Sequence, residues 1–305
     1  MARDILKFAE DYTVATDDVS IILGEPMREH TSFHIGGSAD ALVQPYTAEA
    51  LGIGISLCRR EELPYWVLGK GTNVLVGDRG MAGVVFDMTK MTGLTVEGCT
   101  ITAEAGVLLS VLSHAALEHS LTGLEFASGI PGSVGGGIFM NAGAFGGEMA
   151  QVLTSARIMT EYGEIREISA AELGFGYRSS KVEEKKWIVL EGTFTLTEGD
   201  AAAIEAAMND WNEKRRTKQP LDYPSAGSTF KRPEGYFAGK LIQDAGLAGY
   251  QVGGAQVSEK HCGFVINKDH ASAKDVLNLC NDVIAKVKEQ FGVELEPEIR
   301  KLGDF

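Results

Sequence analysis

The segment from Gly129 to Gly147 constrains the fold most, because eight of its nineteen positions are glycine. Glycine loses more backbone entropy on folding than any other residue, so a chain concentrates it where positive φ angles or close approaches are needed. No charged residue lies between Glu125 and Glu148, which makes backbone N–H groups the natural donors to an anion. The segment therefore predicts a loop that binds a phosphorylated cofactor. The alternative is a turn system that packs two layers closely.

The overall composition is that of a soluble globular chain with an excess of loops. Its 305 residues are enough for two or three domains, and 37 of them are glycine, above the usual share of about 7%. The formal net charge of −14 argues against a surface for nucleic acid or anionic membranes. An anionic ligand would need a local basic pocket or a set of N–H donors.

Cysteine and histidine are scattered along the chain. The four cysteines form no CxxC pair and the six histidines form no ligand cluster, so we expect no metal site and a reducing, cytoplasmic location. The first residues lack the basic-then-apolar layout of a signal peptide. No uncharged apolar run approaches the length of about 18 residues that a membrane span needs, so we expect no membrane insertion.

Hydrophobic spacing and turn residues predict an alternation of helices and strands, an α+β protein. Thr47 is the expected N-cap of a helix over residues 48–63, and a glycine-bearing loop is expected over 69–80. The other expected helices cover residues 108–119, 169–173, 200–216 and 272–291, and the expected strands cover 65–68, 83–88, 94–98, 100–106, 187–196, 262–267 and a hairpin of 152–160 with 163–169. The helix over 200–216 is the expected hinge into the last domain.

Two common nucleotide-binding fingerprints are absent. GKGTNV at residues 69–74 offers no GxxxxGK[ST] frame, and Val74 stands where the GxGxxG motif needs glycine. There is also no GxSxG or HExxH motif. The sequence therefore argues against a P-loop nucleotidase, a Rossmann domain, a serine hydrolase of that type and a zinc protease.

Motifs along nearly the whole chain resemble those of the UDP-N-acetylenolpyruvoylglucosamine reductases, flavoenzymes of bacterial cell-wall precursor synthesis. They are HTSFHIGG at residues 30–37, LGKGTNVLVGDRG at 68–80, GLEFASGIPGSVGGGIFMNAGAFGGE at 123–148, FGYRSS at 175–180, and the C-terminal pair SAGSTFKRPEG at 225–235 and LEPEIRKLG at 295–303. One branch of the family inserts a tyrosine-bearing substrate loop. The short distance from Tyr177 to Ser228 leaves little room for it, so the chain resembles the branch without the insertion.

The resemblance implies an α+β fold in which domains of the vanillyl-alcohol-oxidase (PCMH) type bind FAD and a C-terminal α+β domain binds substrate. The expected domains are residues 1–95, 96–213 and 214–305. FAD would be noncovalent, with two loops around its pyrophosphate. The residues that match these cofactor loops are Gly69, Lys70, Gly71, Thr72, Asn73, Val74, Gly129, Ile130, Pro131, Gly132, Ser133, Gly135, Gly136, Asn141 and Gly143.

The reaction implied by the resemblance is the NADPH-dependent reduction of UDP-N-acetylglucosamine enolpyruvate to UDP-N-acetylmuramate. Hydride would pass from flavin N5 to the vinyl carbon, and Ser228 would then protonate the neighbouring carbon. Arg178 matches the arginine that binds the substrate carboxylate, and Glu298 matches the acid that helps to polarise it. Glu296 lies so near Glu298 in sequence that only the motif register selects between them.

Other positions carry weaker expectations. Tyr177 is expected to contact substrate, and Lys231 and Arg232 are candidates for the diphosphate. His34 stands where the family more often has arginine, which leaves an anion contact from that side chain in doubt. Two alternative functions are an FAD oxidase of the same fold that acts on another alcohol or sugar acid, and a sugar-nucleotide sensor without chemistry. The sequence leaves the oligomeric state open, and a monomer is compatible with it.

Overall fold

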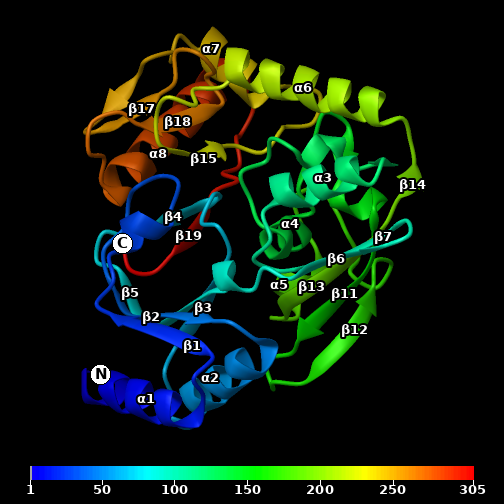
Figure 1. The fold of residues 1–305 in the computed structure, drawn as a ribbon. Helices are drawn as coiled ribbons and strands as arrows, with labels where there is room; N and C mark the ends of the chain where they lie inside the picture. The colour runs from blue at the N-terminus through cyan, green and yellow to red at the C-terminus, as the bar shows by residue number, and fades with distance from the viewer. Residues whose placement is uncertain (1) are drawn as a thin grey trace. The chain divides into compact units, whose positions relative to one another are not determined.

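The computed structural model describes residues 2–305, which form two compact units with separate hydrophobic cores (Figure 1). Unit 1 consists of the chain up to Leu23, Ala41–Lys70 and Gly83–Lys214, and unit 2 of Gly24–Asp40, Gly71–Ala82 and Arg215–Phe305. The chain therefore crosses between the units more than once. The last crossing falls inside a single helix, α6 (Ala201–Lys218), between Lys214 and Arg215.

The first sheet of unit 1 has four strands in the order β1-β2-β5-β3. The strands are β1 (Val19–Leu23), β2 (Ala39–Pro45), β5 (Met81–Asp87) and β3 (Tyr65–Leu68), and the accompanying helices are α1 (Ala2–Ala15) and α2 (Ala48–Arg60). The Thr47 hydroxyl accepts a hydrogen bond from the Ala50 N–H over 3.1 Å, which confirms the predicted N-cap. The Tyr12 hydroxyl donates to the Ala50 carbonyl over 2.6 Å and fixes α1 against α2.

The second sheet of unit 1 has five antiparallel strands in the order β12-β11-β13-β7-β6. They are β12 (Ile165–Ser169), β11 (Leu153–Met159), β13 (Ile188–Thr195), β7 (Thr100–Glu104) and β6 (Leu94–Glu97), and the helices α3 (Leu109–Glu118) and α4 (Val134–Met140) share its core. Gly192 on β13 lies so close to α4 that a Cβ would come within 2.7 Å of the Ile138 side chain. Strands β11 and β12 form the predicted hairpin.

The predicted short helix over residues 169–173 is wrong, because Ser169 ends β12 and the chain then turns. The Glu172 carboxylate accepts from the Ser169 N–H over 3.1 Å and from its hydroxyl over 2.6 Å. These bonds resemble those of a helix N-cap, and the Leu173 N–H donates to the Ser169 carbonyl over 3.1 Å. Gly174 then takes φ 53°, so the chain leaves the helical conformation after a single turn.

Short elements complete unit 1. They are the strand pair β8 (Leu121–Thr122) and β14 (Thr197–Glu198), the hairpin β9 (Gly143–Ala144) and β10 (Gly147–Glu148), the helix α5 (Lys181–Glu184), and the 3-10 turns η2 (Met88–Lys90), η3 (Glu125–Ala127) and η4 (Met149–Gln151).

Unit 2 contains a four-stranded antiparallel sheet in the order β15-β18-β17-β16. Its elements are β15 (Ser225–Ser228), β18 (Phe264–Asn267), β17 (Ala255–Val257), β16 (Gln251–Val252), the helices α7 (Ala238–Asp244) and α8 (Ala273–Phe291), and the 3-10 turn η1 (Met27–His30). Helix α8 packs against β16 and β17 of this sheet, in the orange part of the ribbon in Figure 1. Helix α8 begins with a capping box of Ser272 and Asp275 and ends at Gly292 with φ 69°, so its predicted limits are confirmed within one residue.

The expected loop over residues 69–80 contains a strand that the sequence did not indicate. Strand β4 (Val74–Val76) pairs in parallel with β19 (Arg300–Leu302) near the end of the chain. Gly36 lies against this strand, where a Cβ would approach the Val76 Cβ to 2.8 Å. Residues 30–37 and 71–80 therefore pack together in unit 2. Within residues 2–305, none of the helices combines the length and the apolar character that spanning a membrane requires.

Candidate active site

The glycine-rich segment of unit 1 is held in place at the end of α4. Asn141 terminates the helix in the left-handed region, with φ 44° and ψ 55°, and its side chain is buried. The Asn141 amide donates to the Gly176 carbonyl over 3.0 Å, and its Oδ1 accepts from the Ala150 N–H over 3.0 Å. The segment is therefore fixed to the turn at residues 176–179.

Two serine hydroxyls, one directly before this segment and one within it, are buried without a hydrogen-bond partner among residues 2–305. Ser128 is 7% exposed and Ser133 is 1% exposed, and neither Oγ has a hydrogen-bond partner within residues 2–305. Ser133 even occupies the N-cap position of α4 without making a cap hydrogen bond. Gly69 makes room for this hydroxyl, since a Cβ there would lie 2.6 Å from the Ser133 Oγ. Leaving a buried hydroxyl unpaired costs about 1–3 kcal/mol, so the residues fit a bound group that accepts hydrogen bonds.

Not every N–H of the predicted cofactor loop is directed to a ligand. The N–H groups of Ile130, Val134 and Gly135 donate to backbone carbonyls of unit 1 over 3.0, 2.8 and 2.9 Å. A Cβ on Gly135 would lie 2.9 Å from the Ala105 Cβ, whereas a Cβ on Gly136 would meet only the Ser133 Oγ, at 3.7 Å. Some glycines in the segment are therefore required by packing, and others leave open space.

Tyr177 and Arg178 form the tip of a tight turn in unit 1. The turn is closed by backbone hydrogen bonds between Gly176 and Ser179, over 3.0 and 3.3 Å. Arg178 has φ 54°, a conformation that costs energy for a residue with a Cβ and is often found at functional sites. Its guanidinium donates to the Gly143 carbonyl over 3.2 Å and lies 5.3 Å from the Tyr177 ring centroid. Both predicted substrate contacts therefore lie next to the glycine-rich segment.

In unit 2, Ser228 follows a β-bulge. Ser225 pairs with Ile266 and Ser228 with Phe264, so β15 contains one residue more than β18 over this interval. Gly227 takes φ 74° at the irregularity, as bulges commonly require. Bulges redirect side chains and are frequent beside active sites. The bulge leaves the Ser228 side of the strand exposed to solvent.

Backbone hydrogen bonds place Glu298 beside the strand that carries Ser228. The Glu298 N–H donates to the Thr229 carbonyl over 2.8 Å. The Asn73 amide donates to the Glu298 carbonyl over 3.3 Å, and the Asn73 carbonyl accepts from the Arg300 N–H over 3.0 Å. The structure thus joins the predicted residues Asn73 and Glu298 in one hydrogen-bonded cluster with Thr229, the residue that follows Ser228.

Thr229 holds this cluster to the sheet, although no sequence motif had singled it out. It is fully buried, its N–H donates to the Gly263 carbonyl over 2.8 Å, and its Oγ1 accepts from the Val265 N–H over 2.8 Å. Its only signal in the sequence is a hydroxyl side chain next to Ser228. Ser128, also missed, is likewise a single hydroxyl among apolar neighbours.

The two neighbouring glutamates have different surroundings. Glu296 forms an ion pair with Lys231, whereas Glu298 is half-buried and its backbone joins the cluster around Ser228. Arg232 lies over the Phe237 ring, 4.0 Å from its centroid. Lys231 therefore already has a carboxylate partner, whereas the Glu298 backbone is bonded to Thr229, the residue directly after Ser228.

The first predicted cofactor loop is shared between the units, because Gly69 and Lys70 belong to unit 1 and the following residues to unit 2. Gly71 has φ 67°, and its carbonyl accepts from the Ser32 N–H over 3.0 Å. In unit 2 this loop and the motif at residues 30–37 are therefore neighbours.

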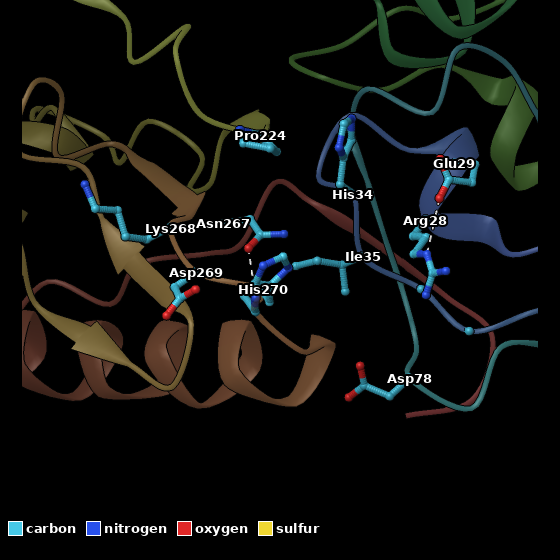
Figure 2. A pocket seen from close by; sticks show the side chains of 13 residues that line it. Arg28, Glu29, His34, Ile35, Asp78, Pro224, Asn267, Lys268, Asp269 and His270 are labelled. Atoms are coloured by element: carbon cyan, nitrogen blue, oxygen red, sulfur yellow. Dashed lines mark hydrogen bonds and ion pairs between the residues drawn. The ribbon is translucent and has the colours of Figure 1, made fainter.

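A separate pocket of about 610 Å³ opens in unit 2 (Figure 2). It is lined by Arg28, Glu29, His34, Ile35, Gly36, Gly37, Asp78, Pro224, Asn267, Lys268, Asp269, His270 and Ala271. Arg28 pairs with Glu29 over 3.2 Å, and the Asp78 carboxylate accepts from the first N–H groups of α8 over 2.7 and 3.0 Å. Among the described residues, none of the predicted catalytic side chains lines it. His34 therefore faces a pocket other than the Ser228 cluster.

Neither a metal-binding cluster nor a disulfide is formed by the side chains of residues 2–305. Across residues 2–305, no group of three or more His, Cys, Asp or Glu is arranged to hold a metal ion. All four cysteines are free thiols, and three of them are buried. Burial raises the pKa of the Cys58 thiol, and that of Cys280, to about 12, so these thiols stay protonated and unreactive at neutral pH.

Known proteins resemble the chain over nearly its whole length. A UDP-N-acetylenolpyruvoylglucosamine reductase of Clostridium perfringens (strain SM101 / Type A) is 52% identical over 287 residues, which cover 94% of each chain. The protein of the same name from Caldanaerobacter subterraneus subsp. tengcongensis is 51% identical over 284 residues, covering 93% of this chain and 94% of that one. The crystal structure of the Thermus caldophilus UDP-N-acetylenolpyruvylglucosamine reductase aligns with a TM-score of 0.79 at 35% identity, covering 93% and 98% of the two chains.

Two family profiles match successive parts of the chain, and their limits differ from those of the two units, because residues 71–82 lie within the first profile and belong to unit 2. An FAD binding domain matches residues 39–169 and the C-terminal domain of UDP-N-acetylenolpyruvoylglucosamine reductase matches residues 219–302. A more distant structure, the glucose dehydrogenase Phl p 4.0202, shares the fold at 15% identity and a TM-score of 0.51. The protein is thus an FAD-dependent oxidoreductase of the PCMH type with an added C-terminal α+β domain. It belongs to the UDP-N-acetylenolpyruvoylglucosamine reductase family, and the predicted family, fold class and flavin dependence are confirmed.

Proposed function

We propose that the protein reduces UDP-N-acetylglucosamine enolpyruvate to UDP-N-acetylmuramate, with NADPH as the source of hydride. FAD supplies the redox chemistry when bound, taking hydride from NADPH and passing it to the vinyl carbon of the substrate. The identity of 52% with a named reductase over 94% of the chain supports the substrate. A cytoplasmic location, predicted from the cysteine pattern, agrees with the use of NADPH. The chain's own residues would bind, polarise and protonate the substrate.

Arg178 and Glu298 would stabilise the negative charge that develops on the substrate. Hydride addition to the vinyl carbon moves charge onto the adjacent carbon and its carboxylate, and donors aimed at those oxygens lower the barrier. The planar guanidinium of Arg178 suits two parallel hydrogen bonds to a carboxylate. Its fixed turn and its hydrogen bond to Gly143 limit the conformations of the side chain. Glu298, if protonated or acting through water, would supply a second polarising group.

Ser228 would protonate the carbanionic carbon. A hydroxyl is a weak acid, so it can act only on a strongly basic carbon at short range and away from bulk water. The bulge before Ser228 and the hydrogen bonds of Thr229 hold its backbone in a fixed position. The single observation that carries this assignment is the Glu298 N–H to Thr229 carbonyl hydrogen bond, which joins donor strand and acid.

Tyr177, Lys231 and Arg232 would contact the remainder of the substrate. Tyr177 is 55% exposed at the tip of its turn, as expected of a side chain that closes on a ligand. Lys231 would have to exchange Glu296 for a phosphate oxygen, because the two side chains form an ion pair in the structure.

We further propose a division into three domains at residues 1–95, 96–213 and 214–305. The first sheet of unit 1 lies before residue 95 and the second sheet after it, apart from the first two residues of β6, Leu94 and Thr95.

The proposed function is tested by anaerobic stopped-flow absorbance at the flavin band. NADPH should bleach the flavin of the holoenzyme, and UDP-N-acetylglucosamine enolpyruvate should then restore its colour. In Ser228→Ala, bleaching should keep its rate, while the recovery should slow by about 10²-fold or more, the usual contribution of a general acid. Ser225→Ala removes a hydroxyl from the same strand and should leave both phases unchanged.

Three outcomes would contradict the proposal. Bleaching without recovery would indicate a different acceptor, and oxygen consumption with another alcohol or sugar acid in the absence of NADPH would indicate an oxidase. Substrate binding without any change in flavin colour would indicate a sensor. A normal recovery rate in Ser228→Ala would remove the serine from the mechanism while leaving the reductase assignment in place.

A further inference from the structure

The hairpin of β9 and β10 carries a phenylalanine at a position that favours glycine. Ala144 pairs with Gly147, so Phe145 and Gly146 form a two-residue loop, and their φ angles are 53° and 89°. Positive φ at both loop residues is the requirement of the type I′ turn, which prefers Asn-Gly or Gly-Gly. The left-handed conformation costs free energy for a residue with a large side chain. A contact made by the ring must therefore offset this cost.

The Phe145 ring stacks on Trp211 of α6. The ring centroids lie 5.5 Å apart, and the ring planes are 14° from parallel, an arrangement that stabilises aromatic pairs beyond their burial. Phe145 remains 44% exposed, so this ring lies at the surface of the unit. On the other strand of the hairpin, the Gln151 amide donates to the Gly146 carbonyl over 3.3 Å. The stack therefore supports the strained tip of the hairpin on the β9 side.

Trp211 is a firm support, because it shares a face of α6 with buried side chains. Ile204, Met208 and Trp211 have the spacing i, i+4 and i+7, which places all three on one face of the helix. The first two are buried, and Trp211 packs against the core of unit 1. The Ser113 hydroxyl of α3 lies 3.8 Å from the Met208 sulfur. The tryptophan thus belongs to a packed helix face.

The hairpin connects this helix face to the predicted carboxylate-binding arginine. The Arg178 guanidinium donates to the Gly143 carbonyl over 3.2 Å, and Gly143 begins β9, just before the Phe145 turn. Strands β9 and β10 have two residues each, and so short a hairpin is not stable by itself. The position of the Gly143 carbonyl therefore depends on what the tip of the hairpin contacts.

We propose that Phe145 and Trp211 are positioning residues for Arg178. Their stack holds β9 where the Gly143 carbonyl fixes the guanidinium, so that the guanidinium meets the substrate carboxylate in one orientation. This role rests on the proposed function, in which Arg178 acts on that carboxylate only after NADPH has reduced the flavin. A displacement of about 1 Å at a reacting group costs up to about 10²-fold in rate.

The strain at Phe145 allows the stack to be removed without a loss of stability. In Phe145→Gly the ring is lost, but glycine adopts φ 53° without strain, so the variant should unfold at the same urea concentration as the wild type. Phe145→Tyr and Trp211→Phe each keep two stacked rings, and Trp211→Ala removes the stack from the helix side. Ile204→Ala is the control, because it removes a buried side chain from the same helix face and leaves the stack in place.

Anaerobic stopped-flow absorbance of the FAD-loaded proteins separates the two half-reactions. We expect Phe145→Gly and Trp211→Ala to be bleached by NADPH within about two-fold of the wild-type rate, and to recover with the enolpyruvyl sugar at least about ten-fold more slowly. Phe145→Tyr and Trp211→Phe should recover within about three-fold of the wild type. Ile204→Ala should unfold at a lower urea concentration and keep the wild-type recovery rate.

A double variant tests whether the stack acts through Arg178. Two residues that act through one interaction are not additive, so Phe145→Gly should slow recovery by no more than about two-fold when it is added to Arg178→Lys. A full second loss in the double variant would overturn the proposal, because the ring would then act on its own.

Three further results would also overturn it. They are a wild-type recovery rate in both Phe145→Gly and Trp211→Ala, an equal slowing of bleaching and recovery in these variants, and a recovery as slow in Ile204→Ala as in Phe145→Gly. The proposed function fails differently: the wild-type holoenzyme itself would then not recover its colour with the enolpyruvyl sugar. If the wild type completes both phases and the stack variants do the same, the positioning role alone is wrong.

Discussion

In unit 1, residues 128–147 leave two serine hydroxyls, those of Ser128 and Ser133, buried without a partner in residues 2–305. In unit 2, the groups around Ser228 bond to one another, because Thr229 uses its N–H, its carbonyl and its hydroxyl in hydrogen bonds within the unit. The first region carries polar groups that its own fold does not satisfy. The second region satisfies its buried polar groups before any ligand arrives.

Because of this difference, we expect the first region to contribute mainly to ligand affinity and the second mainly to stability and to the positions of the reacting groups. Unsatisfied buried donors lower the stability of the ligand-free protein and raise the affinity for a ligand that pairs with them. A satisfied network fixes the positions of catalytic groups and loses stability when one member is removed. Substitutions in the glycine-rich segment should therefore act mainly on FAD affinity, except where a glycine is needed for packing. Substitutions around Ser228 should act on stability and on the reaction.

The largest expected effect is a loss of stability, and it distinguishes two neighbouring glycines of the glycine-rich segment. Gly135→Ala should lower the free energy of unfolding by about 3 kcal/mol, because the new Cβ would crowd Ala105 in a packed core. Gly136→Ala is the matched control in the same helix, where the new Cβ has room. It should leave the stability unchanged or raise it by up to about 1 kcal/mol, since alanine favours helix.

Urea denaturation of the FAD-free variants measures both effects, and flavin fluorescence gives their affinity for FAD. Gly136→Ala should weaken FAD binding by about ten-fold if that glycine is there to admit the cofactor. Equal stability of the two variants would mean that the glycines of this helix serve one purpose, and the division into packing and ligand positions would be wrong.

The second prediction concerns the network of unit 2. Thr229→Val keeps the shape of the side chain but removes the acceptor for the Val265 N–H, so the free energy of unfolding should fall by about 2 kcal/mol. Thr229→Ser retains the hydroxyl and should recover most of this loss. Urea denaturation of the wild type and the two variants, compared at equal m-values, measures the order of their stabilities. A valine variant as stable as the wild type would show that this hydrogen bond does not hold the Ser228 strand.

The third prediction compares two buried serines of unit 1. Ser133→Ala removes a hydroxyl without a partner among the described residues, so the FAD dissociation constant should rise about ten-fold while the ligand-free stability stays the same or increases. Ser113→Ala removes a hydroxyl that donates to the Leu124 carbonyl over 2.8 Å. It should cost about 1 kcal/mol of stability and leave FAD affinity unchanged. Titration of the apoprotein with FAD distinguishes the two, and a reversed result would exclude Ser133 from the cofactor site.

The smallest expected effect is a dependence of stability on pH through His261. Burial lowers the pKa of its imidazole in the folded protein relative to the ordinary value of 6.5. Between the folded pKa and 6.5 the unfolded chain binds more protons, so the contribution of this group is fully present above pH 6.5 and is lost as the pH falls through the folded pKa.

Denaturation of the wild type and His261→Asn from pH 8 to pH 5 isolates this contribution. The stability of the wild type relative to the variant should decrease as the pH falls. If the difference in stability between the wild type and the variant were constant with pH, the imidazole would keep its ordinary pKa in the folded protein. The close approach of Gly239 and Gly263 to the ring would then not exclude its charged form.

Elements with a strong local pattern were predicted well. Helix α2 begins after Thr47, the hairpin of β11 and β12 forms, and α8 starts at its capping box. The failures have two causes. Strand β4 is three residues long and exists because β19 pairs with it from the other end of the chain. Residues 169–173 make only one turn, because Gly174 takes φ 53° directly after them.

The candidate site was predictable to the extent that its residues recur in motifs. The glycine density between residues 129 and 147 indicated a phosphorylated cofactor, and the motif order indicated the family. Three features had no comparable signal: the two unsatisfied hydroxyls, the role of Thr229 in the network, and the hydrogen bond from the Gly263 N–H to the His261 Nδ1. All of them involve common residue types whose meaning depends on their neighbours in space.

The sequence by itself determined the family and the flavin, because these are written in contiguous motifs, and the same motifs supplied the predicted catalytic residues. Only the tertiary structure separated Glu296, paired with Lys231, from Glu298, whose carbonyl accepts from the Asn73 amide. That hydrogen bond joins residues 225 positions apart. Hydrogen bonds and ion pairs depend on distances of a few ångströms, and the distance between remote residues is set by how the whole chain packs.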